Sequence, residues 1–299
     1  MLMFKHILYL LFSIFFLVGC APDRDVIEPT IILEGWIENG EHPVALLHYS
    51  MVMGEEYDSV SQLVMDKLIT LGKVTVSSSN ESAILIGGFD TAYIPPYKYT
   101  SSRLVGVEGE TYTIDVEYDN KTVTAQTTIP APVFFDSIKV QQSPYVDSII
   151  HLTGYVTDTD PSRENYYVLF YRYRGDKQYQ NCFLGLFSDQ NADENHSISM
   201  PIYRNVSTST LKLSDSDNKK GRYFKPWDKI DIKLATVDSI GYKFWSEFSA
   251  LTMTSSIAFM PIYTNVYTNV EGGKGYWIGY GAKVYPLTLR RDTTIRYIR

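Results

Sequence analysis

TYTIDVEYDNKTVTAQTT, at residues 111–128, decides the fold class of this chain. Apolar and polar residues alternate along 111–118 and again along 121–128, which is the period of strands that bury one face. Asp119-Asn120 between the two arms is typical of a tight turn, so the segment predicts a β-hairpin. An isolated hairpin is at best marginally stable, and the flanking sequence should therefore supply more strands.

Short alternating segments precede the hairpin along the chain. They predict strands at 30–37, 42–49, 73–77 and 82–86. A loop or sheet edge is expected at 93–100, because Pro95-Pro96 cannot donate to a central ladder. The polar connection at 51–71 is expected to be helical near 62–68. This density of short strands indicates an immunoglobulin-like or transthyretin-like β-sandwich over residues 30–130.

A second β-rich region follows the Ile129-Pro130-Ala131-Pro132 segment, where two prolines stiffen the chain. Tyr242, Trp245 and Phe248 recur at helical spacing and predict one amphipathic helix over 241–254 that packs on the second sheet. The predicted fold is mainly β, with an N-terminal sandwich followed by a domain at 134–299 that carries this helix. Strands in that domain are expected at 136–142, 148–155, 165–174, 181–186 and 231–237.

Composition excludes several classes of protein. The 299 residues carry a net charge of −7, which argues against a nucleic-acid partner because phosphate binding needs a basic face. Two cysteines exclude a disulfide scaffold, an iron–sulfur cluster and a cysteine-rich zinc site. The 24 tyrosines favour half-buried pleated surfaces, in agreement with a β fold.

The N-terminus has the pattern of a lipoprotein signal peptide at residues 1–19. Lys5 and His6 precede an apolar run, 7–18, that is too short to span a bilayer. The run ends in Leu17-Val18-Gly19-Cys20, which resembles a bacterial lipobox. We expect a diacylglycerol thioether on Cys20, a further acyl chain such as palmitate on its amine, and a tether over 20–29. Two or three acyl chains hold a protein stably at a membrane.

Five segments along the chain together carry a family resemblance: IILEGWI at 31–37, VEGETYTI at 107–114, TIPAP at 128–132 with FDSI at 135–138, WDKIDIKL at 227–234, and PIYTNV at 261–266 with EGGKGYWIGY at 271–280. In this order they resemble the DUF4249 family of Bacteroidota lipoproteins, a family defined only as a domain of unknown function. Tyr276-Trp277 departs from the aliphatic residue and Phe that are usual in the family at that place. The resemblance implies an outer-membrane lipoprotein that accompanies a TonB-dependent transporter, and it implies no catalytic residues.

The sequence contains no established catalytic or phosphate-binding motif. A catalytic Cys182–His196 pair and a metal site built from His42, His48, His151 and His196 are the alternatives, and both are disfavoured because the residues are scattered. Carboxylates at 158–164 and 215–221 resemble calcium loops but are more typical of solvated turns. We therefore expect no enzyme activity, no cofactor and no bound metal.

Tyr276-Trp277 lies in the glycine-rich stretch 272–281, which is interpreted as a tight turn. The pair is either core or an aromatic contact surface for a partner. Alternation along a strand would bury one member, with Trp277 the more buried and Tyr276 the more exposed.

Asp-Ser/Thr triplets recur along the chain and resemble an O-glycosylation sequon. The alternative is that these triplets recur because Asp and Ser side chains bond nearby backbone groups and are therefore common in turns. Ser59 is the best candidate because its loop is expected to be exposed. The candidate hydroxyls are those of Ser59, Thr91, Ser137, Ser148, Ser239 and Thr293.

Together these features predict a lipid-anchored outer-membrane protein that is an accessory or substrate-capture partner of a TonB-dependent transporter. The sequence leaves open whether it faces the periplasm or the cell surface. A structural or adhesive surface protein without a ligand is the alternative, and a lipid-anchored hydrolase is a weaker one.

Overall fold

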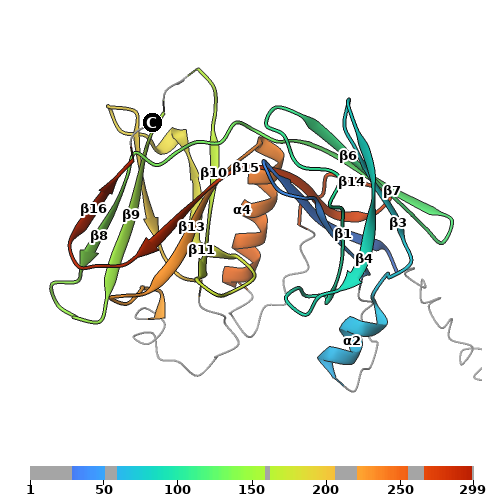
Figure 1. The fold of residues 1–299 in the computed structure, drawn as a ribbon, viewed down its shortest axis with the longest axis horizontal. Helices are drawn as coiled ribbons and strands as arrows, with labels where there is room; N and C mark the ends of the chain where they lie inside the picture. The colour runs from blue at the N-terminus through green and yellow to red at the C-terminus, as the bar shows by residue number, and fades with distance from the viewer. Residues whose placement is uncertain (1–28, 51–58, 159–161, 206–220, 255–265, 298–299) are drawn as a thin grey trace, which may run out of the picture.

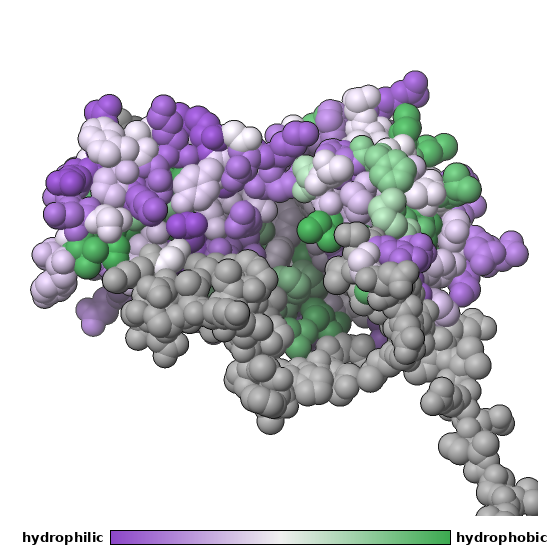
Figure 2. All heavy atoms as spheres, turned by 90° about the horizontal axis from the view of Figure 1, so that it is seen from below, coloured by the Kyte–Doolittle hydropathy of each residue, from purple (hydrophilic) through white to green (hydrophobic). Residues whose placement is uncertain are grey.

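The computed structural model describes residues 29–50, 59–158, 162–205, 221–254 and 266–297. It confirms the predicted mainly β fold class. Two β-sandwiches lie side by side, and α4 (Ser239–Thr254), the longer of the two described α-helices, stands between them (Figure 1). Seen from below, hydrophobic surface gathers in the hollow between the two lobes (Figure 2). Within the described residues, no helix has the length and apolar character needed to cross a membrane.

The N-terminal sandwich is built around the predicted hairpin. Tyr118 pairs with Lys121, and Asp119 and Asn120 both have positive φ (50° and 57°), as a tight two-residue hairpin turn requires. Helix α2 (Val60–Asp66) lies in the connection that was expected to be partly helical. The strands are β1 (Ile31–Glu38), β2 (Val44–Tyr49), β3 (Lys73–Ser77), β4 (Ser82–Phe89), β5 (Tyr97–Thr100), β6 (Thr111–Tyr118) and β7 (Lys121–Thr128).

The C-terminal sandwich packs two sheets over a second core. A four-stranded sheet in the order β12-β9-β8-β16 faces β11, β10, β13 and β15. Helix α4 covers the other face of β10, β13 and β15 through a third apolar cluster, as the Tyr242, Trp245 and Phe248 pattern predicted. The strands are β8 (Ser137–Gln142), β9 (Ile150–Thr157), β10 (Tyr166–Tyr173), β11 (Gln180–Ser188), β12 (Ser197–Ile202), β13 (Lys229–Val237), β14 (Val270–Glu271), β15 (Lys274–Thr288) and β16 (Thr293–Arg296), with a short 3-10 helix at Asp189–Asn191.

One strand, β15, belongs to both sandwiches. Its first half runs parallel to β1, from Lys274 opposite Ile32 to Tyr280 opposite Glu38. Its second half runs antiparallel to β13, ending with Thr288 opposite Lys229. Residues 270–280, which follow the expected boundary at 130–134, thus pair with strands of the first sandwich, β14 with β7 and β15 with β1.

The glycine-rich stretch 272–281 is mostly strand, so its interpretation as a tight turn is wrong beyond Gly272-Gly273. Its glycines allow close approach of neighbouring backbones. A Cβ on Gly275 would overlap the Leu33 carbonyl oxygen, and one on Gly281 would overlap that of Pro130. Gly275 also has a φ of 116°, which other residues rarely adopt.

Candidate functional site

A cleft of about 590 Å³ opens at the junction of the two sandwiches. That volume lies within the range of about 300–1,000 Å³ that is typical of small-molecule sites. Strands β1 and β15, strands β10 and β13, and helix α4 all contribute side chains to it. The lining is rich in aromatic residues, namely Trp36, Tyr93, Phe170, Tyr179, Trp245, Tyr276 and Tyr280.

An ion pair crosses the junction beside these rings. Lys233 Nζ on β13 donates to Glu38 Oε1 on β1 at 2.5 Å, and their side chains are only 9% and 12% exposed. Each charge compensates the desolvation of the other, so neither could be buried there alone. The pair therefore also fixes the two sandwiches relative to each other at the cleft.

A second ion pair lies on the C-terminal wall. Arg172 Nε donates to Asp231 Oδ2 at 2.9 Å. The Arg172 guanidinium and the Lys233 ammonium both lie over the ring of Tyr179, at 4.4 and 4.3 Å from its centroid. Burial raises the pKa of Tyr179 to about 12, so this phenol is neutral at physiological pH.

The apolar floor of the cleft is held by contacts between rings. Trp245 Nε1 on α4 donates to the Tyr280 hydroxyl at 2.9 Å, and Phe170 packs edge-on against both rings. The ring of Tyr276 lies 4.2 Å from that of Phe244. Burial raises the pKa of Tyr276 and of Tyr280 well above the usual value. The floor is thus a preformed, uncharged aromatic surface.

The N-terminal rim carries a second aromatic pair. The rings of Trp36 and Tyr93 lie nearly parallel, 28° apart, with their centroids separated by 6.2 Å. Lys98 Nζ lies 4.6 Å from the centre of the Tyr93 ring and 3.0 Å from Asp90 Oδ2. The hydrogen bond from Lys98 lowers the pKa of Asp90. These contacts hold the loop that carries Tyr93 against the cleft.

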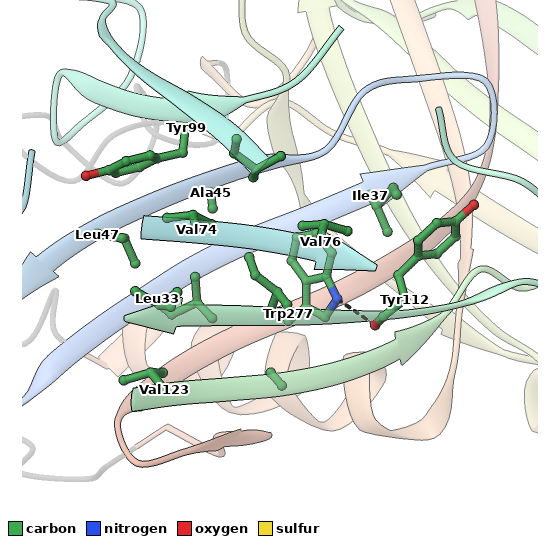
Figure 3. Packing of buried hydrophobic residues seen from close by; sticks show 14 of the residues in the cluster. Leu33, Ile37, Ala45, Leu47, Val74, Val76, Tyr99, Tyr112, Val123 and Trp277 are labelled. Carbon is green, nitrogen blue, oxygen red and sulfur yellow. Dashed lines mark hydrogen bonds between the residues drawn. The ribbon is translucent and has the colours of Figure 1, made fainter. Parts of the chain in front are cut away.

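Trp277 does not belong to a partner surface, which corrects half of the predicted Tyr276-Trp277 contact. Its side chain is fully buried in the first core, and its Nε1 donates to the Tyr112 carbonyl at 3.0 Å (Figure 3). The side chain of Asn269 binds both the N–H and the carbonyl of Trp277, as a neighbouring strand would. Tyr276 points to the opposite face and lines the cleft. Strand alternation thus separates the two rings.

The sequon residues are spread over the surface rather than gathered into one site. Ser59, the favoured candidate, is exposed and its Oγ caps α2 by accepting from the Gln62 N–H at 3.1 Å. Ser137 and Thr293 are half-buried within strands, whereas Thr91, Ser148 and Ser239 are exposed. Asp90 and Asp238 accept backbone N–H bonds within their own turns, which agrees with turn chemistry. Modification of these residues stays a prediction, and Cys20 lies outside the described residues.

The considered nucleophile Cys182 is buried in the second core, and burial raises the pKa of its thiol.

The histidines considered for a metal site lie in separate surroundings. Although burial lowers the pKa of His48, the hydrogen bond and the charge of Glu34 raise it overall. His151 packs against the Tyr223 ring, and His42 bonds the Leu104 carbonyl. In the described part of the chain, no three His, Cys, Asp or Glu side chains are grouped to hold a metal. One possible calcium loop, 215–220, falls outside that part.

Sequence reasoning found Tyr276 but missed most of the cleft. Trp36 lies in the strand expected at 30–37 and Glu38 directly follows it, but neither residue had an expected role. The usable signal was in β13, where Asp231 and Lys233 interrupt an otherwise apolar buried strand. Buried charges need partners, and both partners lie at this cleft.

Similarity to known proteins places the chain in one family. No curated protein matches it. Among solved structures, a chain of the crystal structure of chicken CNTN1 FN1-FN3 domains matches with 12% identity and a TM-score of 0.22. That match covers 70% of this chain and 60% of the other, and at this TM-score it carries no argument. The family model described as "Domain of unknown function (DUF4249)" matches residues 21–285, and the chain therefore belongs to this family.

Proposed function

We propose that this chain is a lipid-anchored outer-membrane protein that captures a ligand in its interdomain cleft and hands it to a TonB-dependent transporter. The observation that carries the proposal is the preformed aromatic cleft with its two ion pairs. The lipobox-like segment ending at Cys20 supports the anchor, and the resemblance to transporter-associated lipoproteins supports the partner.

The position of the cleft along β1 suits ligand capture. Thr30, where the tether would join the fold, donates its N–H to Ser50 Oγ at 3.0 Å. Trp36 and Glu38 lie at the opposite end of β1, roughly 20 Å further along at about 3.3 Å per residue. The cleft is therefore remote from the anchored end. A lipid tether raises the effective concentration at the transporter without requiring tight affinity.

The proposal contains no catalytic step. The carboxylates of Glu38 and Asp231 are held by Lys233 and Arg172. Glu41 and His42 also line the cleft, and His42 Nδ1 contacts the Leu104 carbonyl. A general acid or base needs a carboxyl group or imidazole placed to exchange a proton with substrate. Most of the cleft lining consists of aromatic rings and charges held in ion pairs, and such a surface suits reversible binding.

The test is a pull-down of the tagged full-length chain from gently solubilised outer membranes. We expect a TonB-dependent transporter to co-purify. The Cys20→Ala chain is the matched control, since the substitution should remove the anchor and leave the folded residues from 29 onward unaltered. Recovery of the wild-type chain without a transporter would contradict the proposed partnership.

A further inference from the structure

We infer that the ligand of the interdomain cleft is a short neutral oligosaccharide. This inference rests on the proposed capture function and names its substrate class. It follows from the faces of the rings, the balance of charge and the hydrogen-bonding groups at the cleft.

The ring faces at the rim suit the flat side of a sugar. Trp36 and Tyr93 are half-buried, their rings stack on each other, and both residues line the cleft. The face of an aromatic ring is electronegative. A pyranose ring carries polarised C–H groups on its flat side, and these are attracted to such a face. Stacking against Trp36 would therefore orient a sugar ring, and the Tyr93 ring that packs against Trp36 would hold the indole in place.

The charges at the cleft balance one another. Lys233 is paired with Glu38, and Arg172 is paired with Asp231. The remaining charged groups at the mouth, Lys177 and Glu41, have opposite signs as well. A charged ligand would meet as many like charges as opposite ones while losing its own hydration, which is costly. The balance favours a neutral ligand.

The cleft also disfavours a purely apolar ligand. A hydrocarbon would strip water from the polar groups without replacing the lost hydrogen bonds. Arg172 carries five N–H donors, of which the Asp231 contact uses Nε, and the Gln178 amide both donates and accepts. Sugar hydroxyls also donate and accept, so they match this mixture. A volume of about 590 Å³ suits an oligosaccharide of roughly two or three rings.

The test is a binding titration of the purified full-length chain in detergent, followed by tryptophan fluorescence and calorimetry. The neutral probes are maltotriose, cellotriose, mannotriose and triacetylchitotriose. Trigalacturonate serves as the anionic probe, deacetylated chitotriose as the cationic probe, and tetra-alanine as the peptide probe. Trp36→Ala and Tyr93→Ala remove the rim, whereas Tyr145→Ala removes a 92% exposed ring on the other sandwich.

We expect saturable binding of at least one neutral trisaccharide and none of the charged probes. Trp36→Ala and Tyr93→Ala should each weaken that binding by about tenfold, as lost aromatic stacking does. Tyr145→Ala should leave it unchanged. Trp36→Ala and Tyr93→Ala should lower the melting temperature but leave unfolding cooperative, because both rings also pack within the fold. Preference for a charged probe or the peptide, or no binding of any neutral probe, would overturn the inference. Co-purification of the transporter with the same chain would then still support the proposed function. Failure of the oligosaccharide inference is therefore distinguishable from failure of the proposed transporter partnership.

Discussion

Lys233 on β13 and Glu38 on β1 form a buried ion pair that joins the two sandwiches, with Nζ and Oε1 separated by 2.5 Å. The two residues are 195 positions apart in the sequence. They meet because β15 lies between their strands and pairs with both. The same arrangement forms the cleft, so the stability of the junction and the shape of the candidate site have one origin.

Lys233→Met should lower the free energy of unfolding by about 3–5 kcal/mol, because it leaves the Glu38 carboxylate buried without a counter-charge. Denaturant unfolding measures this change. The double variant Glu38→Leu with Lys233→Met removes both charges and should recover most of the loss. A single variant as stable as the wild type would show that the pair is not desolvated.

Trp277→Ala should lower the free energy of unfolding by about 3–5 kcal/mol, because it leaves a cavity in the first core. It also leaves the Tyr112 carbonyl without the indole donor. Tyr276→Ala, its neighbour on the cleft face, should cost clearly less. Thermal melts of the two variants measure the difference, and equal losses would argue against the opposite placement of the two rings.

Gly275→Ala should destabilise the chain severely or prevent folding. The added methyl group would meet the Leu33 carbonyl oxygen on β1, and the backbone there has positive φ. Gly88→Ala is the matched control, since nothing lies within 4 Å of its added Cβ. Expression yield and circular dichroism of both variants measure the contrast. A well-folded Gly275→Ala chain would contradict the pairing of β15 with β1.

The stability of the chain should fall slightly as pH rises through the folded pKa of His48. Glu34 raises this pKa above the ordinary value of 6.5, so the imidazolium stabilises the fold fully only below that value. Both side chains are partly exposed, and the effect should be small. Unfolding titrations between pH 5 and 8 should show this slope in the wild type. His48→Gln should flatten this dependence of stability on pH. An unchanged slope in His48→Gln would show that other titrating groups cause the dependence.

Cys20→Ala should release the chain from outer membranes, because acyl chains supply the membrane affinity. Carbonate-washed membrane fractions measure the partition. Normal membrane association of this variant would remove the lipoprotein interpretation.

Local patterns predicted most of the fold, and long-range pairing accounts for what they missed. The 111–128 hairpin and helix α4 follow from periodicity and turn chemistry within about 20 residues. By contrast, the pairing of Lys274 with Ile32 joins opposite ends of the chain, and no local pattern specifies it. Glycines at 272–281 therefore resembled a turn, whereas their role is to admit the neighbouring backbones of β1 and of the 128–130 segment.

The candidate site was difficult to predict for the same reason. Trp36, Tyr93, Tyr179 and Lys233 lie on four separate segments, and only the completed junction brings them together. Local sequence identified the aromatic pair at 276–277, and strand alternation correctly favoured Trp277 as the buried member. The strand β12 was missed because Pro201 weakens its pattern, and it lies at a sheet edge, where proline is tolerated.

The central claim is that this chain is the anchored capture partner of a TonB-dependent transporter. The most direct measurement is the molar ratio of transporter to tagged full-length chain in complexes isolated from gently solubilised outer membranes, quantified by mass spectrometry. The account predicts one transporter in near-equimolar amount with the wild-type chain and a sharp loss with Cys20→Ala. Transporter levels no higher than those in an untagged control would contradict it.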